Sequence, residues 1–136
     1  MVEIRNYTPK DFKDIKELLK LRSLNKEKPI NEKALERKIT ANPDSILVAI
    51  EGNRIVGTQF IVEDYLPILY RLAVHPDFIG KGIGKDLTHY AEKLLRKKGY
   101  DHANVLIASD DTELQEYFER EGYDQGSKFH WMVKDL

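Results

Sequence analysis

The stretch VHPDFIGKGIGKDL, residues 74–87, decides the fold, because it leads from a strand-like run into a helix-like run through three alternating glycines. The run before it, ILYRLAV (68–74), has the length and apolar character of a strand that begins after Pro67. After it, Leu87, Tyr90, Ala91, Leu94 and Leu95 recur at helical spacing until Gly99 ends the helix. A second apolar run, HANVLIA (102–108), follows. This order predicts a right-handed crossover and therefore a parallel strand pair.

The rest of the chain predicts antiparallel strands and further helices. In SILVAIEGNRIVGTQFIVED (45–64), two β-branched runs flank Gly52-Asn53, a pair that suits the tight turn of a hairpin. VEIRNY (2–7) and SKFHWMVKDL (127–136) alternate as strands do, and helical patterns cover about 12–22, 30–39 and 110–122. We therefore expect an α/β fold with a central mixed, mostly antiparallel sheet that contains one parallel pair and is flanked by helices.

Length and composition predict one soluble globular domain over residues 1–136. Hydrophobic residues make up 41% of the chain and charged residues 33%, and no linker or low-complexity tract divides it. The formal net charge of −1 argues against broad binding to nucleic acid. The basic run Arg96-Lys97-Lys98 ends a predicted helix, where it complements the helix dipole.

Several kinds of site and location are excluded by what the chain lacks. There is no cysteine, which excludes disulfides, thiolate nucleophiles and cysteine-based metal sites. The four histidines show no metal-ligand spacing, so no metal is predicted. No segment has the length of a signal sequence or a membrane span, so we expect a cytoplasmic protein with no membrane partner.

The glycine turn itself predicts either a phosphate site or a tight structural turn. A glycine-rich turn that opens a helix presents unpaired N–H groups at the positive end of the helix dipole, and Lys81 and Lys85 add charge. A nucleotide P-loop is excluded because Asp86 follows Lys85 where Ser or Thr is required. The dinucleotide fingerprint is excluded by the G-x-G-x-G spacing. The glycines alone do not distinguish a ligand site from a plain turn.

The residues around the turn resemble a known family. LAVHPDFIGKGIGKDLTHYAEKLLRKKGY (72–100) resembles the acetyl-CoA-binding motif of the GCN5-related N-acetyltransferase (GNAT) superfamily, and the predicted element order resembles that fold. YFEREGY (117–123) resembles the second signature of the family, a short helix that closes with an aromatic and glycine-containing run. The two motifs lie at the expected separation.

The resemblance implies acetyl-CoA as co-substrate and a set of donor-binding residues. Leu72, Ala73 and Val74 would offer backbone hydrogen bonds to the pantetheine arm, which would lie where their strand splays from NVLIA. Phe118 would also contact the donor. The turn would hold the pyrophosphate through Ile79, Gly80, Lys81, Gly82, Ile83, Gly84 and Lys85. An acyl group would face the hairpin side of the sheet, where the amine attacks.

Three departures from the family leave the catalytic residues open. Ile79 stands where the family usually has Arg or Gln. Phe118 stands where many members carry a tyrosine that protonates the leaving thiolate, and Tyr117 lies one residue earlier. ILYRLAV holds no carboxylate that could act as base. The candidates are Tyr70, Tyr117 and Glu63, with Asp64 or a water chain as alternatives.

The leading hypothesis is therefore an N-acetyltransferase that transfers an acetyl group from acetyl-CoA to a primary amine of a small molecule or peptide. The alternatives are a non-catalytic, regulatory acyl-CoA-binding module and a structural interaction protein whose turn binds nothing. Trp131 on the last predicted strand suits a homodimer. No motif identifies the acceptor.

Overall fold

The computed structural model describes residues 2–22 and 30–136. The chain divides into two compact units, Met1–Leu106 and Ile107–Leu136. The predicted single domain over the whole chain stays a prediction.

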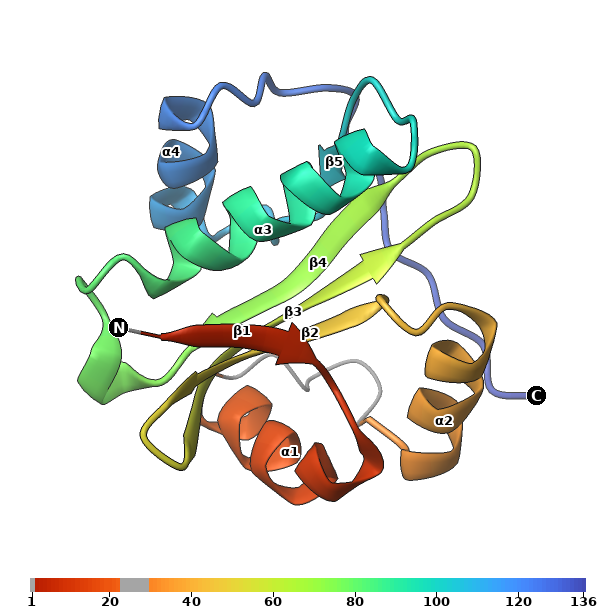
Figure 1. The fold of residues 1–136 in the computed structure, drawn as a ribbon. Coiled ribbons are helices and arrows are strands. Elements are labelled where there is room, and N and C mark those ends of the chain that lie inside the picture. Colours follow the sequence, from red (N-terminus) through yellow and green to blue (C-terminus); the bar gives the residue numbers. More distant parts are fainter. Residues whose placement is uncertain (1, 23–29) are drawn as a thin grey trace. The chain divides into compact units, whose positions relative to one another are not determined.

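The first unit is built on a five-stranded mixed sheet, drawn in Figure 1. The strands lie in the order β1-β2-β3-β4-β5, and all neighbours are antiparallel except β4 and β5, which are parallel. Their bounds are Glu3–Asn6, Ile46–Glu51, Arg54–Val62, Ile68–Val74 and Asn104–Val105. The predicted mixed, mostly antiparallel sheet with helices beside it is confirmed.

Helices cover both faces of this sheet (Figure 1). On one face, α1 (Phe12–Leu21) and α2 (Glu32–Ala41) pack against β2, β3 and β4. On the other, α3 (Ile83–Lys97) packs its buried stripe of Leu87, Ala91 and Leu95 against Leu47, Ala49, Ile61 and Leu69. Of the stripe predicted for α3, Leu87, Ala91 and Leu95 are buried and Leu94 is half-buried, whereas Tyr90 is exposed.

The start of α1 is fixed by a capping box that also carries an ion pair. Pro9–Asp11 forms a short 3-10 turn, in which Thr8 donates its N–H to Asp11 Oδ2 at 2.8 Å. Asp11 is only 6% exposed, and Arg5 binds both of its carboxylate oxygens, at 2.7 and 2.9 Å. The end of β1 and the start of α1 are therefore held together by one carboxylate.

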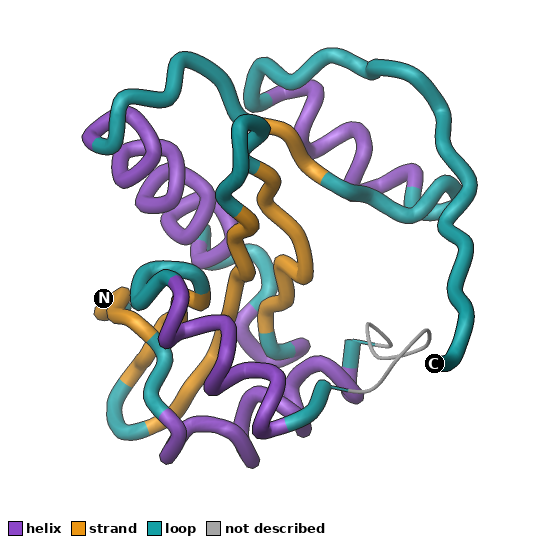
Figure 2. The backbone as a smooth tube through the Cα atoms, turned by 90° about the vertical axis from the view of Figure 1, so that its right-hand side faces the viewer, coloured by secondary structure: helices purple, strands orange, loops and turns teal. Residues whose placement is uncertain are grey.

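The two strands predicted near the C-terminus differ from expectation. The run 102–108 forms a strand only at Asn104–Val105. In the second unit, α4 (Thr112–Arg120) begins with the side chain of Asp111 as cap, and Gly122 follows it at φ +95°. Residues 123–136 contain no regular secondary structure (Figure 2), so the prediction of a last strand over 127–136 is wrong. An alternating pattern needs a partner strand, and the described second unit contains none.

Neither a membrane-spanning helix nor a metal-binding cluster is found among the described residues. Among residues 2–22 and 30–136, no helix combines the length and apolarity that a membrane crossing needs. The same residues hold no group of three or more His, Cys, Asp or Glu side chains placed to bind a metal ion.

Candidate functional site

The glycine turn after β4 adopts a conformation that only some of its glycines require. Pro76–Phe78 forms a 3-10 turn, and His75 Nδ1 accepts the N–H of Asp77 at 3.1 Å. Gly80 and Gly82 have φ of +84° and +81°, values that side-chain-bearing residues rarely adopt, and open space lies where a Cβ would be. Gly82 caps α3, which therefore begins at Ile83, within the glycine turn itself.

This turn gathers unpaired backbone donors at the start of α3. The first helical bond from the turn is donated by Asp86 N–H to Gly82 O, at 2.9 Å. The N–H groups from Gly80 to Lys85 have no acceptor among the described residues. The N–H of Ile79 is directed to Pro76 O at 3.5 Å, so this residue contributes less than predicted. A cluster of unpaired N–H groups at the positive end of a helix binds anions.

Two cations lie beside the turn on one aromatic ring. Lys81 Nζ is 4.8 Å from the centroid of the Phe78 ring, and the guanidinium carbon of Arg54 is 5.5 Å from it. Arg54 was not a sequence candidate, because it begins β3 and only folding brings the hairpin to the turn. Together they add positive potential next to the unpaired donors.

The strand pair β4–β5 opens beside this turn. The ladder contains the pairs Ile68–Asn104 and Leu69–Val105 and ends where Leu106 N–H donates to Leu69 O at 3.1 Å. From Tyr70 onward, this edge of β4 faces no strand of the first unit in the described structure. His75 donates its N–H to Val56 O on β3, so alternation directs the N–H groups of Val74 and Leu72 to the open edge. The edge thus contains the predicted residues 72–74.

A β-bulge interrupts β4 at the same place. The register pairs Tyr70 with Phe60 and Ala73 with Thr58, which leaves Gln59 opposite both Arg71 and Leu72. Arg71 has φ of +52° and is the only described residue other than glycine with a positive φ. Gln59 is fully buried, and its side-chain amide has no hydrogen-bond partner among the described residues. Strain and an unsatisfied polar group together are typical of functional sites.

The bulge also shifts the alternation of the strand. Leu69, Leu72 and Val74 pack on the α3 face, whereas Tyr70 and Ala73 pack with the core under α1 and α2. A regular strand would place Leu69 and Leu72 on opposite faces. Sequence reasoning missed this irregularity, although the polar Arg71 within ILYRLAV is its one visible signal.

Tyr70, a candidate acid or base, lies half-buried beside the bulge. Its ring meets that of Phe60 edge-on, with 5.6 Å between centroids, and Lys38 Nζ lies 5.3 Å from its centroid. Burial raises the pKa of the Tyr70 phenol, and the charge of Arg71 offsets part of this effect. The phenol is therefore protonated at neutral pH and can donate a hydrogen bond.

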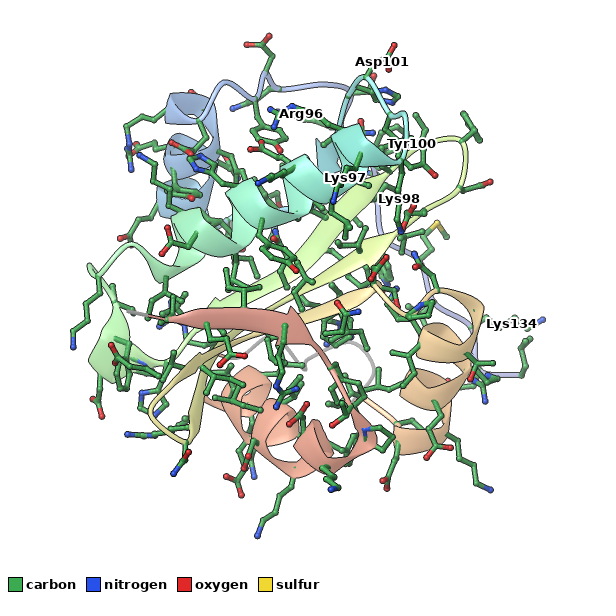
Figure 3. All side chains as sticks on the ribbon, in the orientation of Figure 1. Arg96, Lys97, Lys98, Tyr100, Asp101 and Lys134 are labelled. Atoms are coloured by element: carbon green, nitrogen blue, oxygen red, sulfur yellow. The ribbon has the colours of Figure 1, made fainter. Side chains whose placement is uncertain are left out.

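Glu63, the candidate base, takes part in an ion-pair network. Its carboxylate binds Lys98 Nζ at 2.7 Å and also accepts a hydrogen bond from Asn42, while Lys98 binds Asp44 at 3.2 Å. Burial lowers the pKa of Lys98, but its hydrogen bonds to Glu63 and Asp44 outweigh burial and raise that pKa overall. Lys98, labelled in Figure 3, follows the last turn of α3, so it serves this network rather than the helix dipole alone. The Glu63 carboxylate is therefore part of a structural ion-pair network.

The remaining predicted residues, Tyr117 and Phe118, belong to the second unit. Phe118 is buried in α4 and stacks edge-on with Tyr117 and Tyr123, at centroid distances of 5.0 and 5.2 Å.

Comparisons with known proteins agree on one family. A family model described as an acetyltransferase (GNAT) domain matches residues 9–129. An acetyltransferase of Sodalis glossinidius is 30% identical over 90% of this chain and 87% of that protein. An acetyltransferase of Pectobacterium atrosepticum is 31% identical over 90% of this chain and 88% of its own length. Among solved structures, PaiA N-acetyltransferase from Thermoplasma acidophilum, in complex with coenzyme A, aligns with a TM-score of 0.83 at 22% identity, covering 95% of this chain and 93% of that one.

Proposed function

Because this chain belongs to the GNAT acetyltransferase family, we propose that it transfers an acetyl group from acetyl-CoA to a primary amine. One observation carries the proposal. The unpaired N–H groups from Gly80 to Lys85 lie next to the open edge of β4. Acetyl-CoA presents a pyrophosphate and an amide-containing arm, which are the two kinds of ligand that these features suit.

The turn would hold the pyrophosphate mainly through its backbone. One anion at an exposed helix end gains about 0.3–1 kcal/mol, so binding needs several N–H donors together. The side chain of Ile79 offers no polar group and is 55% exposed, so it cannot replace the family's usual Arg or Gln. Lys81 and Arg54 would supply the charge beside the turn.

The open edge of β4 would bind the pantetheine arm as an added strand. The N–H of Val74 faces this edge, and an extended ligand pairs with such groups as a neighbouring strand does. The N–H of Leu72, next to the bulge, would donate to the carbonyl oxygen of the thioester. A fixed donor of this kind stabilises the negative charge that develops there during attack.

The proposed reaction uses few side chains of this protein. The acceptor nitrogen forms a bond to the thioester carbon, the carbon–sulfur bond breaks, and the sulfur leaves as a thiolate that takes up the proton. An amine with a pKa near 10.4 must first lose its own proton, for which β4 provides no carboxylate. Holding amine and thioester together would therefore supply most of the rate enhancement, with Tyr70 as a hydrogen-bond donor at the site.

The second candidate function is that of a regulatory acyl-CoA-binding module without turnover. Two observations favour it: Glu63 is engaged by Lys98 and Asn42, and Phe118 stands where many relatives carry a tyrosine. Such a module would keep the donor-binding turn and lack acetyl transfer.

Calorimetric titration and an acetyl-transfer assay separate these functions. We expect acetyl-CoA to bind at least tenfold more tightly than S-acetylpantetheine, which lacks the pyrophosphate. We also expect thiol release in the presence of at least one amine from a broad panel. Equal affinity for the two donors would contradict the proposed role of the turn. Tight binding of acetyl-CoA without any thiol release would favour the regulatory module.

A further inference from the structure

The two faces of the sheet differ in the chemistry that β4 presents at the bulge. On the α3 face, Leu69 is buried, and the half-buried Leu72 and Val74 pack against the apolar core under α3. On the other face, Ala73 is buried, and the half-buried Tyr70 and Arg71 carry polar groups. A polar acceptor would therefore meet compatible side chains at the bulge on the side of α1 and α2.

Two cations lie on that side, above one pair of aromatic rings. Lys38 of α2 places its Nζ 5.3 Å from the centroid of Tyr70, and Arg71 places its guanidinium carbon 5.9 Å from that of Phe60. The two rings are themselves in edge-on contact. Lys38 and Arg71 thus come from different elements and converge on the same small surface, which we call the Lys38–Arg71 surface.

The charge of Lys38 is not neutralised by a close carboxylate in the described structure. Its Nζ donates to the backbone oxygen of Ile61, and no ion pair joins it to an acid among the described residues. Glu63 is near enough to influence Lys38, yet its carboxylate binds Lys98 and Asn42. Burial lowers the pKa of Lys38 to about 8, so the group is still mostly charged at pH 7.

A purely structural role accounts for only part of this arrangement. The hydrogen bond to Ile61 uses one of the three donors of an ammonium group, which leaves two for a ligand. Desolvating a charge costs free energy even when the group is only half-buried, as Lys38 is, whereas a neutral donor could cap the same carbonyl oxygen. The charge itself therefore calls for an anionic partner.

We propose that the acceptor carries an anionic group, such as a carboxylate, in addition to its amine, and that the Lys38–Arg71 surface binds this group. The inference rests on the proposed acetyl transfer. It names the acceptor class as amino acids or peptides with an acidic group. The same charges would repel acceptors with several amines, which gives specificity against polyamines and aminoglycosides.

Three acceptors of equal length test the proposal: aminohexanoate, hexylamine and diaminohexane, which differ only in the group at the far end. We expect kcat/KM to be at least tenfold higher for aminohexanoate than for diaminohexane. Lys38→Met should remove most of this difference by raising the KM for aminohexanoate, and Lys38→Arg should retain it. Lys33→Met, an exposed lysine on the same helix, is the matched control and should leave the ratio unchanged.

The contrary results distinguish a wrong acceptor assignment from a wrong proposed function. A preference of the wild type for diaminohexane, or an unchanged ratio in a folded Lys38→Met variant, overturns the acceptor assignment alone. Failure of acetyl-CoA to bind overturns the proposed function and this inference together. If acetyl-CoA binds but none of the three amines reacts, the affinities of hexanoate and hexylamine for the protein–acetyl-CoA complex test the proposal instead. Hexanoate that binds more tightly than hexylamine and is weakened by Lys38→Met supports the proposal, and the opposite order overturns it.

Discussion

The three alternating glycines of the turn have different tasks. Gly80 and Gly82 hold positive φ values, whereas Gly84 already belongs to α3, where a Cβ would meet Val74 and Leu72 at 3.7 and 3.9 Å. Those distances are ordinary van der Waals contacts. Two of the three evenly spaced glycines are therefore needed for their backbone conformation, and the third is an ordinary helical residue.

Exchanging two of these glycines for alanine should have opposite effects on stability. Gly82→Ala forces a side chain into the left-handed region, which costs about 1–2 kcal/mol, and it should weaken acetyl-CoA binding by displacing the N–H donors. Gly84→Ala should stabilise the fold by roughly 0.5–1 kcal/mol, because glycine is a poor residue within a helix. Urea unfolding and calorimetric titration measure both effects. Equal free energies of unfolding for the two variants would contradict this account.

Residues of the site differ in how far the sequence reveals them. The turn could be predicted because its glycines, lysines and following helix are neighbours in the chain. Arg54, Lys38 and Gln59 could not, because each reaches the site from another element and has no motif of its own. Pairing of distant elements is information that local patterns do not contain.

At the scale of elements, local signals predicted the helices and hairpin well and the last strands poorly. The helical patterns over 12–22 and 30–39 correspond to α1 (Phe12–Leu21) and α2 (Glu32–Ala41). A strand also depends on its neighbour: β5 keeps only the two residues that pair with β4, and 127–136 finds no partner within its unit. Strand prediction failed where the presence of a partner strand, rather than the alternating pattern, determines whether a strand forms.

The start of α1 predicts a stability difference that depends on pH. Burial alone would raise the pKa of Asp11, but the hydrogen bonds from Arg5 and Thr8 outweigh it and lower that pKa below its ordinary value. The stabilisation that ionised Asp11 gives to the folded state is therefore complete above its unfolded pKa of about 3.9 and is lost as the pH falls through its lower folded pKa. Asp11→Asn should cost about 1.5–3 kcal/mol at pH 7.

Urea unfolding of wild type and variant over a pH series measures this difference. The gap in the free energy of unfolding should stay constant from neutral pH down to about 5 and close below about 4. Asp14→Asn, at an exposed position in the same helix, provides the control and should produce little change. A gap that persists unchanged in acid would show that the charge of Asp11 is not what stabilises this helix start.

At the scale of the whole molecule, the sheet separates the two proposed substrates. The donor would lie along the open edge of β4 and at the start of α3, whereas the acceptor would approach from the side of α1 and α2. The bulge is the one place that both would reach. The fold class and the glycine turn were predictable from the sequence, whereas the Lys38–Arg71 surface required the packing of α2 against β3 and β4.

Donor binding should therefore stabilise the molecule measurably. At a concentration one hundred times the Kd, a ligand that binds only the folded state adds about 2.7 kcal/mol. For a chain of this size, that raises the Tm by on the order of 10 °C. Differential scanning calorimetry with acetyl-CoA measures the shift, and hexylamine alone should cause none. An unchanged Tm at saturating acetyl-CoA would contradict donor binding by the folded protein.

Arg71 is the extra residue of β4, and the strand would keep its two faces without it. With Arg71 deleted, Leu72 and Val74 would follow Tyr70 in regular alternation and still face α3, while Ala73 would still lie on the side of α1 and α2. A one-residue deletion would therefore remove the irregularity and leave the apolar layers of the core in place. The packing of the core accommodates the bulge but does not require it.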